Sequence, residues 1–268
     1  MGESQSKVFM FDNSDPEMQE AYENARANFR YFWREVAWER RRIIPALGMA
    51  CVKAPFSDGE ETGDSENPEV EHMWMSEIDF DGQFVSGVLL NSPNWLKSVS
   101  EGDSARFPLT EISDWMYAIN GDVYGAYTVN LLRSRMGRRE RQEHDGAWGL
   151  NFGDPTKIRV VPQPKAGMFQ RWFGKPPVEA DEHPMSLTMA ESLKEQLSRD
   201  KSLSTTKDDQ GWTLLHQEAL AGSVATVKVL LAAGADPKAV TKNGMTPLKL
   251  ARSLGWDDVV ALLKPRKE

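Results

Sequence analysis

The chain of 268 residues has room for two modest domains, and its formal net charge of −8 opposes sequence-independent binding to a nucleic-acid backbone. Its single cysteine, Cys51, excludes an intrachain disulfide framework and a cysteine-based zinc site, and we expect a buried thiol on a strand. No stretch has the length and apolarity of a membrane span, and Met1–Lys7 lacks the hydrophobic core of a signal peptide, so we expect a cytoplasmic protein without membrane partners.

A long amphipathic helix is predicted near the N-terminus. The run Ser14–Glu17 provides a capping side chain, a proline near the first helical position and an acid in the first turn. Apolar residues then recur every three or four positions from Met18 to Val36, and several are aromatic. We expect this stripe to cover one face of a sheet.

After Arg40–Arg42 the pattern changes to that of strands. The expected strands are Ile43–Phe56, Val70–Phe80, Phe84–Leu90, Ala105–Leu109 and Ser113–Ile119. Asp81-Gly82 favours a tight hairpin turn, because this dipeptide tolerates positive φ angles. The predicted fold class of this region is α+β, with the N-terminal helix on a curved antiparallel sheet.

Several short motifs in this region resemble an uncharacterised bacterial domain, the YegJ-like domain. They are Glu71-His72-Met73-Trp74, Gly87–Pro93, Glu101-Gly102-Asp103, Asp114–Tyr117 and Gly125–Thr128. The resemblance covers about residues 10–155 and implies bacterial origin, but this family has no assigned activity to transfer. We therefore predict a first domain at residues 1–155, followed by a proline- and glycine-rich connector at 156–184.

The C-terminal part contains an internal repeat. Gly211–His216 matches Gly244–Lys249 at an offset of 33 residues, the period of a helix-turn-helix unit that must stack on a copy of itself. This pattern resembles the ankyrin repeat over about residues 208–264, and Met185–Leu197 carries one helical stripe. We predict a short all-α array at residues 185–268, made of two repeats and a capping helix, and the resemblance implies protein binding.

Two repeats leave the ends of the array exposed, so we expect the array to dock on the preceding domain. Glu218 replaces the alanine that is usual in the ankyrin pattern, and we expect it to be read by a partner or to be solvated. The same resemblance implies that His216 forms a hydrogen bond between neighbouring repeats.

Chemistry is weakly indicated in this sequence. Cys51, His72 and Asp114 fall on predicted strands and are the candidate thiol, base and orienting acid of a catalytic site. A metal site of His72 with Glu69, Glu71 or His144 has no characteristic ligand spacing. No phosphate-binding loop or nucleophile elbow is found, and we predict no enzyme, no cofactor and no metal site.

The leading hypothesis is a non-enzymatic protein that binds one protein partner, more specifically an immunity or antitoxin-type inhibitor of a bacterial toxin. An acidic chain suits a basic, nuclease-like effector, and nucleic acid is not expected as a direct ligand. One alternative is an enzyme with its site on the N-terminal sheet and repeats that recruit substrate; another is a structural adaptor.

The candidate partner contacts lie on an acidic loop, near the repeat helices and on the loop between the repeats. They are Glu60, Glu61, Trp212, Gln217, Asp236, Lys238, Lys242, Asn243 and Trp256. Core positions are an equally good interpretation of Trp212 and Trp256.

Overall fold

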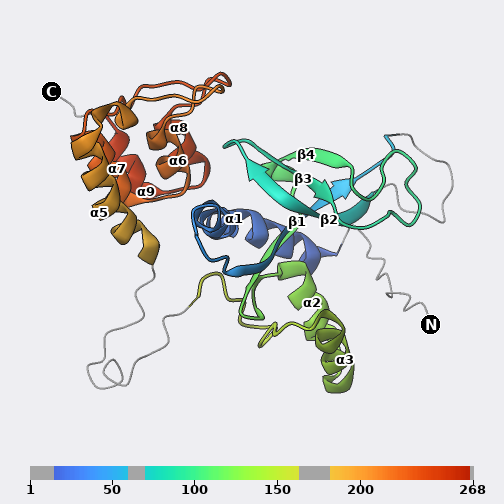
Figure 1. The fold of residues 1–268 in the computed structure, drawn as a ribbon. Helices are drawn as coiled ribbons and strands as arrows, with labels where there is room; N and C mark the ends of the chain where they lie inside the picture. Colours follow the sequence, from blue (N-terminus) through green and yellow to red (C-terminus); the bar gives the residue numbers. More distant parts are fainter. Residues whose placement is uncertain (1–14, 60–69, 163–181, 266–268) are drawn as a thin grey trace, which may run out of the picture.

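The computed structural model describes residues 15–59, 70–162 and 182–265 (Figure 1). The first part contains α1 (Pro16–Glu39), β1 (Leu47–Phe56), β2 (Glu71–Phe80), β3 (Phe84–Leu89), β4 (Ser104–Pro108), the 3₁₀ turn η1 (Leu109–Glu111), β5 (Asp114–Ile119), β6 (Asp122–Gly125), α2 (Tyr127–Arg135) and α3 (Arg138–Trp148). The second contains α5 (Pro184–Arg199), the 3₁₀ turn η2 (Lys201–Ser204), α6 (Leu214–Leu220), α7 (Val224–Ala232), α8 (Pro247–Ser253) and α9 (Asp257–Leu263).

The predicted fold class is confirmed: a long helix lies on an antiparallel sheet, and an all-helical region follows. The six strands are ordered β4-β3-β2-β1-β5-β6, and each neighbouring pair is antiparallel. The carboxylate of Asp15 accepts from the backbone N–H of Glu17 at 3.0 Å and caps α1. Phe29 and Phe32 on α1 are fully buried, and the indole of Trp115 on β5 donates to the carbonyl of Ala25 at 2.7 Å.

Helix α2 packs beside α1 and β5, and its Val129 reaches the other face of the sheet. Here a second, small cluster gathers around Cys51 and Met116 and includes Phe152 from the segment after α3. Cys51 is 1% exposed and lies on β1, as expected for a buried strand cysteine. Neither α2 nor α3 was predicted from the sequence.

The first strand begins later than predicted. Residues Ile43–Ala46 form a loop, and β1 starts at Leu47. The carboxylate of Glu39 accepts from the backbone N–H groups of Ala46 and Leu47 at 2.9 and 3.2 Å, so the end of α1 holds this loop in place. Proline at position 45 was the signal against an interior strand, because it removes a backbone donor.

The C-terminal helices form two layers, with α6 beside α8 in one and α5, α7 and α9 in the other. The predicted capping helix is α5, which begins at Pro184 with His183 as its cap and packs along α7. The imidazole of His216 accepts from the backbone N–H of Thr213 through Nδ1 and donates to the carbonyl of Ala239 through Nε2, at 3.1 Å each. It thereby links the first repeat to the loop that leads to the second, as the resemblance implies.

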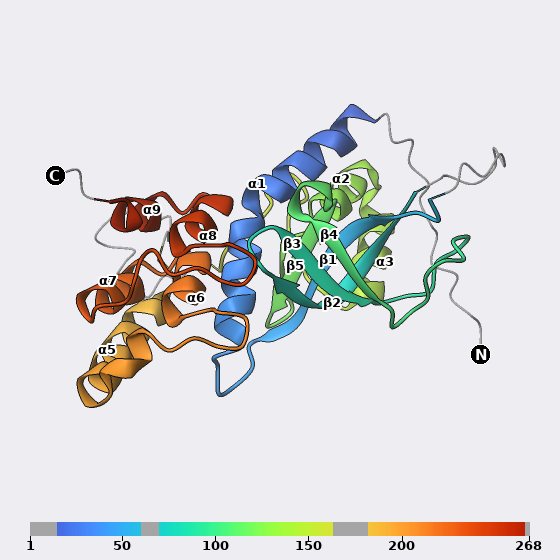
Figure 2. The ribbon, with the colours of Figure 1, turned by 90° about the horizontal axis from the view of Figure 1, so that it is seen from above.

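The array is docked on the first domain, as its shortness predicts. Seen from above, α6 and α8 lie between α1 and the layer of α5, α7 and α9 (Figure 2). Arg30 of α1 donates to the carbonyl of Gly255 at 3.0 Å, and the ring of Tyr31 lies edge-on to Trp256 at 6.3 Å. Apolar residues of both parts therefore share one continuous core cluster.

Candidate functional site

Asp114, the candidate orienting acid, is fully buried and holds the start of α2. Its carboxylate accepts from the backbone N–H groups of Trp115, Tyr127 and Thr128 at 2.8–2.9 Å, and from the Thr128 hydroxyl at 2.6 Å. The N–H groups of a first helical turn need acceptors, and Asp114 supplies one from the neighbouring strand. Its role is therefore structural, and its oxygens are already engaged.

His72, the candidate base, pairs with a serine. Its Nδ1 lies 2.5 Å from the hydroxyl of Ser113, and its ring stacks on Tyr22 of α1 at 5.2 Å. Burial, followed by the nearby Lys53 cation, lowers the pKa of His72 from 6.5 to about 4. The imidazole is therefore neutral at pH 7.

The predicted combination of Cys51, His72 and Asp114 is not assembled as a catalytic triad. Within the described residues, no hydrogen bond joins Cys51 to either of the other two side chains. Burial also raises the pKa of the Cys51 thiol well above its usual range, which keeps it protonated and unreactive. The groove between β1 and β2 described below is lined by other residues.

The candidate metal ligands do not converge in the described part of the chain. Glu71 accepts from the backbone N–H of Asn94 at 3.0–3.1 Å, and His144 pairs with Asp145 at 3.0 Å. A search of the described residues finds no group of three or more His, Cys, Asp or Glu side chains that could hold a metal ion. Glu69 lies outside the described residues.

The loop between the repeats presents four of the nine predicted contacts. Asp236, Lys238, Lys242 and Asn243 are all exposed. The loop is held by hydrogen bonds: Asp236 accepts from the N–H of Lys238 at 2.8 Å, and the N–H of Lys242 donates to the carbonyl of Gln210 at 2.8 Å. These side chains are therefore displayed on an ordered backbone. Gln217 is also exposed, on α6.

Glu218 is neither solvated nor available to a partner, so both expectations for it are wrong. The residue is 4% exposed, and its carboxylate lies 2.6 Å from the guanidinium of Arg41 in the loop after α1. The other oxygen accepts from the hydroxyl of Thr226 on α7 at 2.6 Å. The departure from the ankyrin pattern therefore serves docking between the two domains.

Trp256 is also a docking residue. It is 5% exposed, its indole N–H donates to the carbonyl of Leu220 at 3.0 Å, and it packs against Tyr31. Trp256 therefore occupies a core position, which was the alternative interpretation of this residue, and it is not part of the proposed contact surface. Trp212 is half-buried, with its ring 5.9 Å from that of His216. Glu60 and Glu61 lie outside the described residues.

Sequence reasoning missed the residues of the first domain that receive the array. Arg41 was noted as part of an arginine run, and Tyr31 was not singled out because it falls beside the main stripe of α1. The array contacts a second, shorter row of side chains on α1 and the residues just after it. This row consists of Tyr31, Arg34, Trp38 and Arg41. Its spacing of three and four was the available signal.

Comparisons with known proteins agree with both predicted resemblances. The family model described as uncharacterized protein conserved in bacteria (DUF2314) matches residues 15–152, and a model of ankyrin repeats (3 copies) matches residues 186–268. An ankyrin repeat protein of Neisseria meningitidis serogroup B is 41% identical over 261 residues, which are 97% of this chain and 98% of that protein. The uncharacterized protein YegJ of Escherichia coli K12 is 30% identical over 93 residues, which cover 35% of this chain and 56% of YegJ.

Among solved structures, one similar chain comes from the complex of a predatory endopeptidase of Bdellovibrio bacteriovorus with an immunity protein. The match has 22% identity and a TM-score of 0.27, and covers 52% of this chain and 63% of that one. A similarity at this level supports no conclusion about function. No helix among the described residues has the length and apolarity needed to cross a membrane.

Proposed function

Because the chain belongs to the DUF2314 family of bacterial proteins and carries ankyrin repeats, which indicate protein–protein interaction, we propose that it binds one protein partner without catalysing a reaction. More specifically, we propose an immunity or antitoxin-type inhibitor that neutralises a bacterial toxin. The toxin class that fits is a basic, nuclease-like effector.

The observation that carries the proposal is the exposed, ordered loop between the repeats. Asp236, Lys238, Lys242 and Asn243 project from a backbone fixed by hydrogen bonds to itself and to the preceding loop. A surface that is ordered before binding loses less conformational entropy when a partner arrives. A pre-ordered display of both charge signs suits selective binding to one partner.

Docking on the first domain restricts where a partner can bind. Arg41, Glu218 and Trp256 fill the side of α6 and α8 that faces α1, so this side has no room for another protein. Repeat arrays commonly bind through their concave helical surface. Here the loop tips and Gln217 remain, which favours a contact made at the edge of the array.

Charge supports a basic partner. The whole chain has a formal net charge of −8, which attracts a cationic protein over the screening length of the solvent and accelerates association. Acidic side chains can also imitate the phosphates that a nuclease-like toxin binds. The predicted contacts Glu60 and Glu61 belong to the most acidic segment of the sequence.

The test is co-expression of the chain with toxin-like products of its neighbouring genes, followed by affinity measurement on any pair that restores growth. The variant Lys238→Glu/Lys242→Glu reverses both lysine charges of the loop. It is expected to weaken binding by about tenfold or more, equal to about 1.4 kcal/mol, because it removes the direct contacts of the two lysine side chains, even though the added negative charge favours encounter with a basic partner. The matched control is Lys228→Glu, because Lys228 is exposed on α7, in the layer away from α1. Equal affinities for the loop variant and the control would exclude the loop from the interface.

A further inference from the structure

The sheet of the first domain is split at one end. In β1, Val52–Phe56 pair with β2, whereas Leu47–Cys51 pair with β5 alone. The matching half of β2, Ser76–Phe80, pairs with β3 alone. Among the described residues, the Leu47–Cys51 edge of β1 and the Ser76–Phe80 edge of β2 therefore lack a strand partner here. Two of their backbone groups are bonded by side chains: the carbonyl of Ile78 accepts from Arg40 at 2.8 Å, and the N–H of Leu47 donates to Glu39 at 3.2 Å.

The split coincides with a backbone irregularity at Glu77. Its φ angle is 52°, in the left-handed region that a residue with a side chain adopts at a cost of about 1–2 kcal/mol. The pairing of β2 with β3 shifts register between Ser76 and Asp79, which marks a bulge around this residue. Strained backbone of this kind often accompanies function, and here it turns an exposed carboxylate toward the split.

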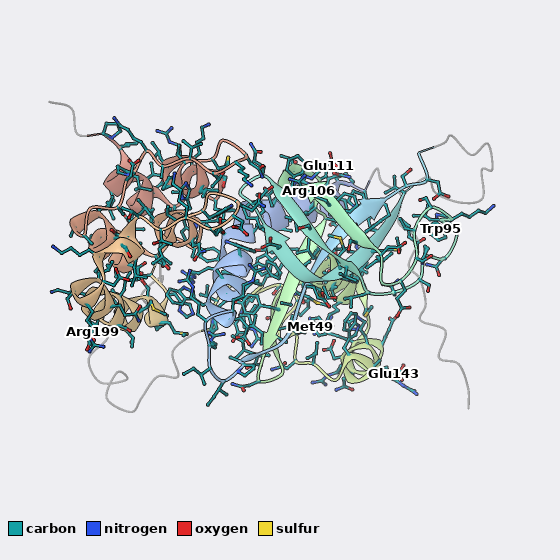
Figure 3. All side chains as sticks on the ribbon, turned by 45° about the horizontal axis from the view of Figure 1, so that its top comes forward. Met49, Trp95, Arg106, Glu111, Glu143 and Arg199 are labelled. Carbon is teal, nitrogen blue, oxygen red and sulfur yellow. The ribbon has the colours of Figure 1, made fainter. Side chains whose placement is uncertain are left out.

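A groove of about 440 Å³ occupies the split, within the size range of ligand pockets. Its walls include Val36 of α1, Leu47, Met49 and Ala50 of β1, and Ile78 of β2. Met49 is labelled on β1 in Figure 3. The loop that leads from α1 into β1 carries two large apolar side chains in solvent, Ile43 at 99% and Ile44 at 81% exposed.

The charges around the groove leave one carboxylate unpaired. Arg40 bonds to Asp79 at 3.0 Å, Arg41 to Glu218 at 2.6 Å and Arg42 to Glu39 at 2.7 Å. Glu77, which also lines the groove, has no ion-pair partner among the described residues. The arginine run is therefore neutralised, and the remaining local charge is negative.

We propose that this groove binds an extended segment of a protein partner, with alternating apolar side chains and a lysine or arginine that pairs with Glu77. Unpaired strand edges bind extended chains through backbone hydrogen bonds, and pockets for alternate side chains add selectivity. The apolar walls receive the apolar side chains, and Ile43 and Ile44 extend that contact. A lipid surface fits less well, because Arg40, Arg41 and Arg42 are all held in ion pairs and leave no cation for anionic headgroups.

This groove is separate from the loop of Asp236–Asn243, and the inference rests on the proposed function in one respect, that the segment belongs to a protein partner. A peptide therefore tests the groove without the loop. If the variant Lys238→Glu/Lys242→Glu loses the partner but still binds the peptide, the two surfaces act independently.

The probe is a short synthetic peptide that alternates valine with threonine and carries one central lysine, titrated into the full ¹⁵N-labelled chain. We expect amide shifts at Ala50, Glu77 and Ile78, several-fold weaker binding when the peptide lysine is replaced by glutamate, and loss of binding when alternate peptide nitrogens are methylated. Glu77→Gln is expected to weaken binding several-fold, while Glu111→Gln, at a distant edge of the domain in Figure 3, leaves it unchanged.

A second variant, Glu77→Gly, removes the carboxylate and relieves the left-handed backbone, so it folds at least as well as the native chain and still binds the peptide more weakly. The proposal is overturned if those amides do not shift, or if the lysine and glutamate peptides bind equally. The proposal is also overturned if the native chain does not bind the peptide but self-associates or binds phosphatidylserine vesicles, and Ile43→Ser/Ile44→Ser abolishes that interaction.

Discussion

Replacement of Arg41 by alanine tests how the array is fixed to the first domain. The Arg41–Glu218 pair has a 2.6 Å contact, and its side chains are 20% and 5% exposed. In Arg41→Ala the carboxylate of Glu218 stays buried and keeps one hydrogen bond, from Thr226. Breaking a fully buried pair costs about 3–5 kcal/mol, and because Arg41 is partly exposed and Thr226 remains, we expect about 2–3 kcal/mol.

The opposite replacement is expected to be milder. Glu218→Ala introduces the residue that is usual in the ankyrin pattern and leaves Arg41 able to reach water, so we expect a loss of about 1 kcal/mol. The double variant Arg41→Ala/Glu218→Ala is then more stable than Arg41→Ala alone, because no unpaired carboxylate is buried. Arg40→Ala is the matched control, since the Arg40–Asp79 pair is 50% and 62% exposed and contributes at most about 1 kcal/mol.

Urea unfolding of the four variants gives these free energies, and solution scattering reports whether the array stays docked. Equal destabilisation of Arg41→Ala and the double variant, or an Arg41→Ala variant as stable as Arg40→Ala, would rule out the buried carboxylate of Glu218 as the cause. A domain separation in Arg41→Ala that the double variant reverses would confirm that the buried carboxylate drives the effect.

Three further predictions concern the first domain. Gly82→Ala is expected to weaken docking of the array, because the new Cβ, at a φ of 96°, would lie 2.4 Å from the side chain of Leu250. The control Gly102→Ala has a similar φ of 88° but open space around the new Cβ. It is expected to cost about 1–2 kcal/mol of backbone strain and to leave the array docked, as measured by solution scattering. The folded protein favours the neutral form of His72, so the stability that this residue contributes is fully present above pH 6.5 and is lost as the pH falls toward about 4. His72→Gln is therefore expected to reduce the pH dependence of the free energy of unfolding in urea between pH 6.5 and about 4. Cys51 is buried, so its thiol is expected to react with a thiol reagent only after denaturation. Cys51→Ala is expected to leave the affinity for the partner unchanged. Rapid labelling of the native chain would show instead that the thiol is accessible.

Local signals predicted much of the fold. The Asp15 cap and the apolar stripe specify α1, and Asp81-Gly82 specifies the β2–β3 turn. By contrast, α2 follows Ala126, which has a left-handed conformation, and the first turn of the helix is capped by Asp114 from β5. A helix whose cap comes from another element has no start signal in its own sequence, which is why α2 was missed.

The site was less predictable, because docking depends on pairs that are far apart in the chain. Glu218 was recognised as unusual, but its partner Arg41 lies 177 positions earlier and has no pattern that links the two. Exposure of Asp236 and Lys238 followed from their place in a turn between repeats, a local property that the sequence does carry. The split between β1 and β2 depends on the backbone at Glu77, where glutamate gives no signal of a left-handed residue.

We propose that this chain inhibits one toxic protein by binding it. The most direct measurement is the activity of the purified partner, titrated with the full chain and with Lys238→Glu/Lys242→Glu. We expect partner activity to fall to its floor at a fixed stoichiometry with the native chain. With the variant, where binding is weak enough to resolve, the same inhibition is expected to need a concentration about tenfold or more higher. Full partner activity in a saturated complex, or turnover of a substrate by the chain itself, would contradict it.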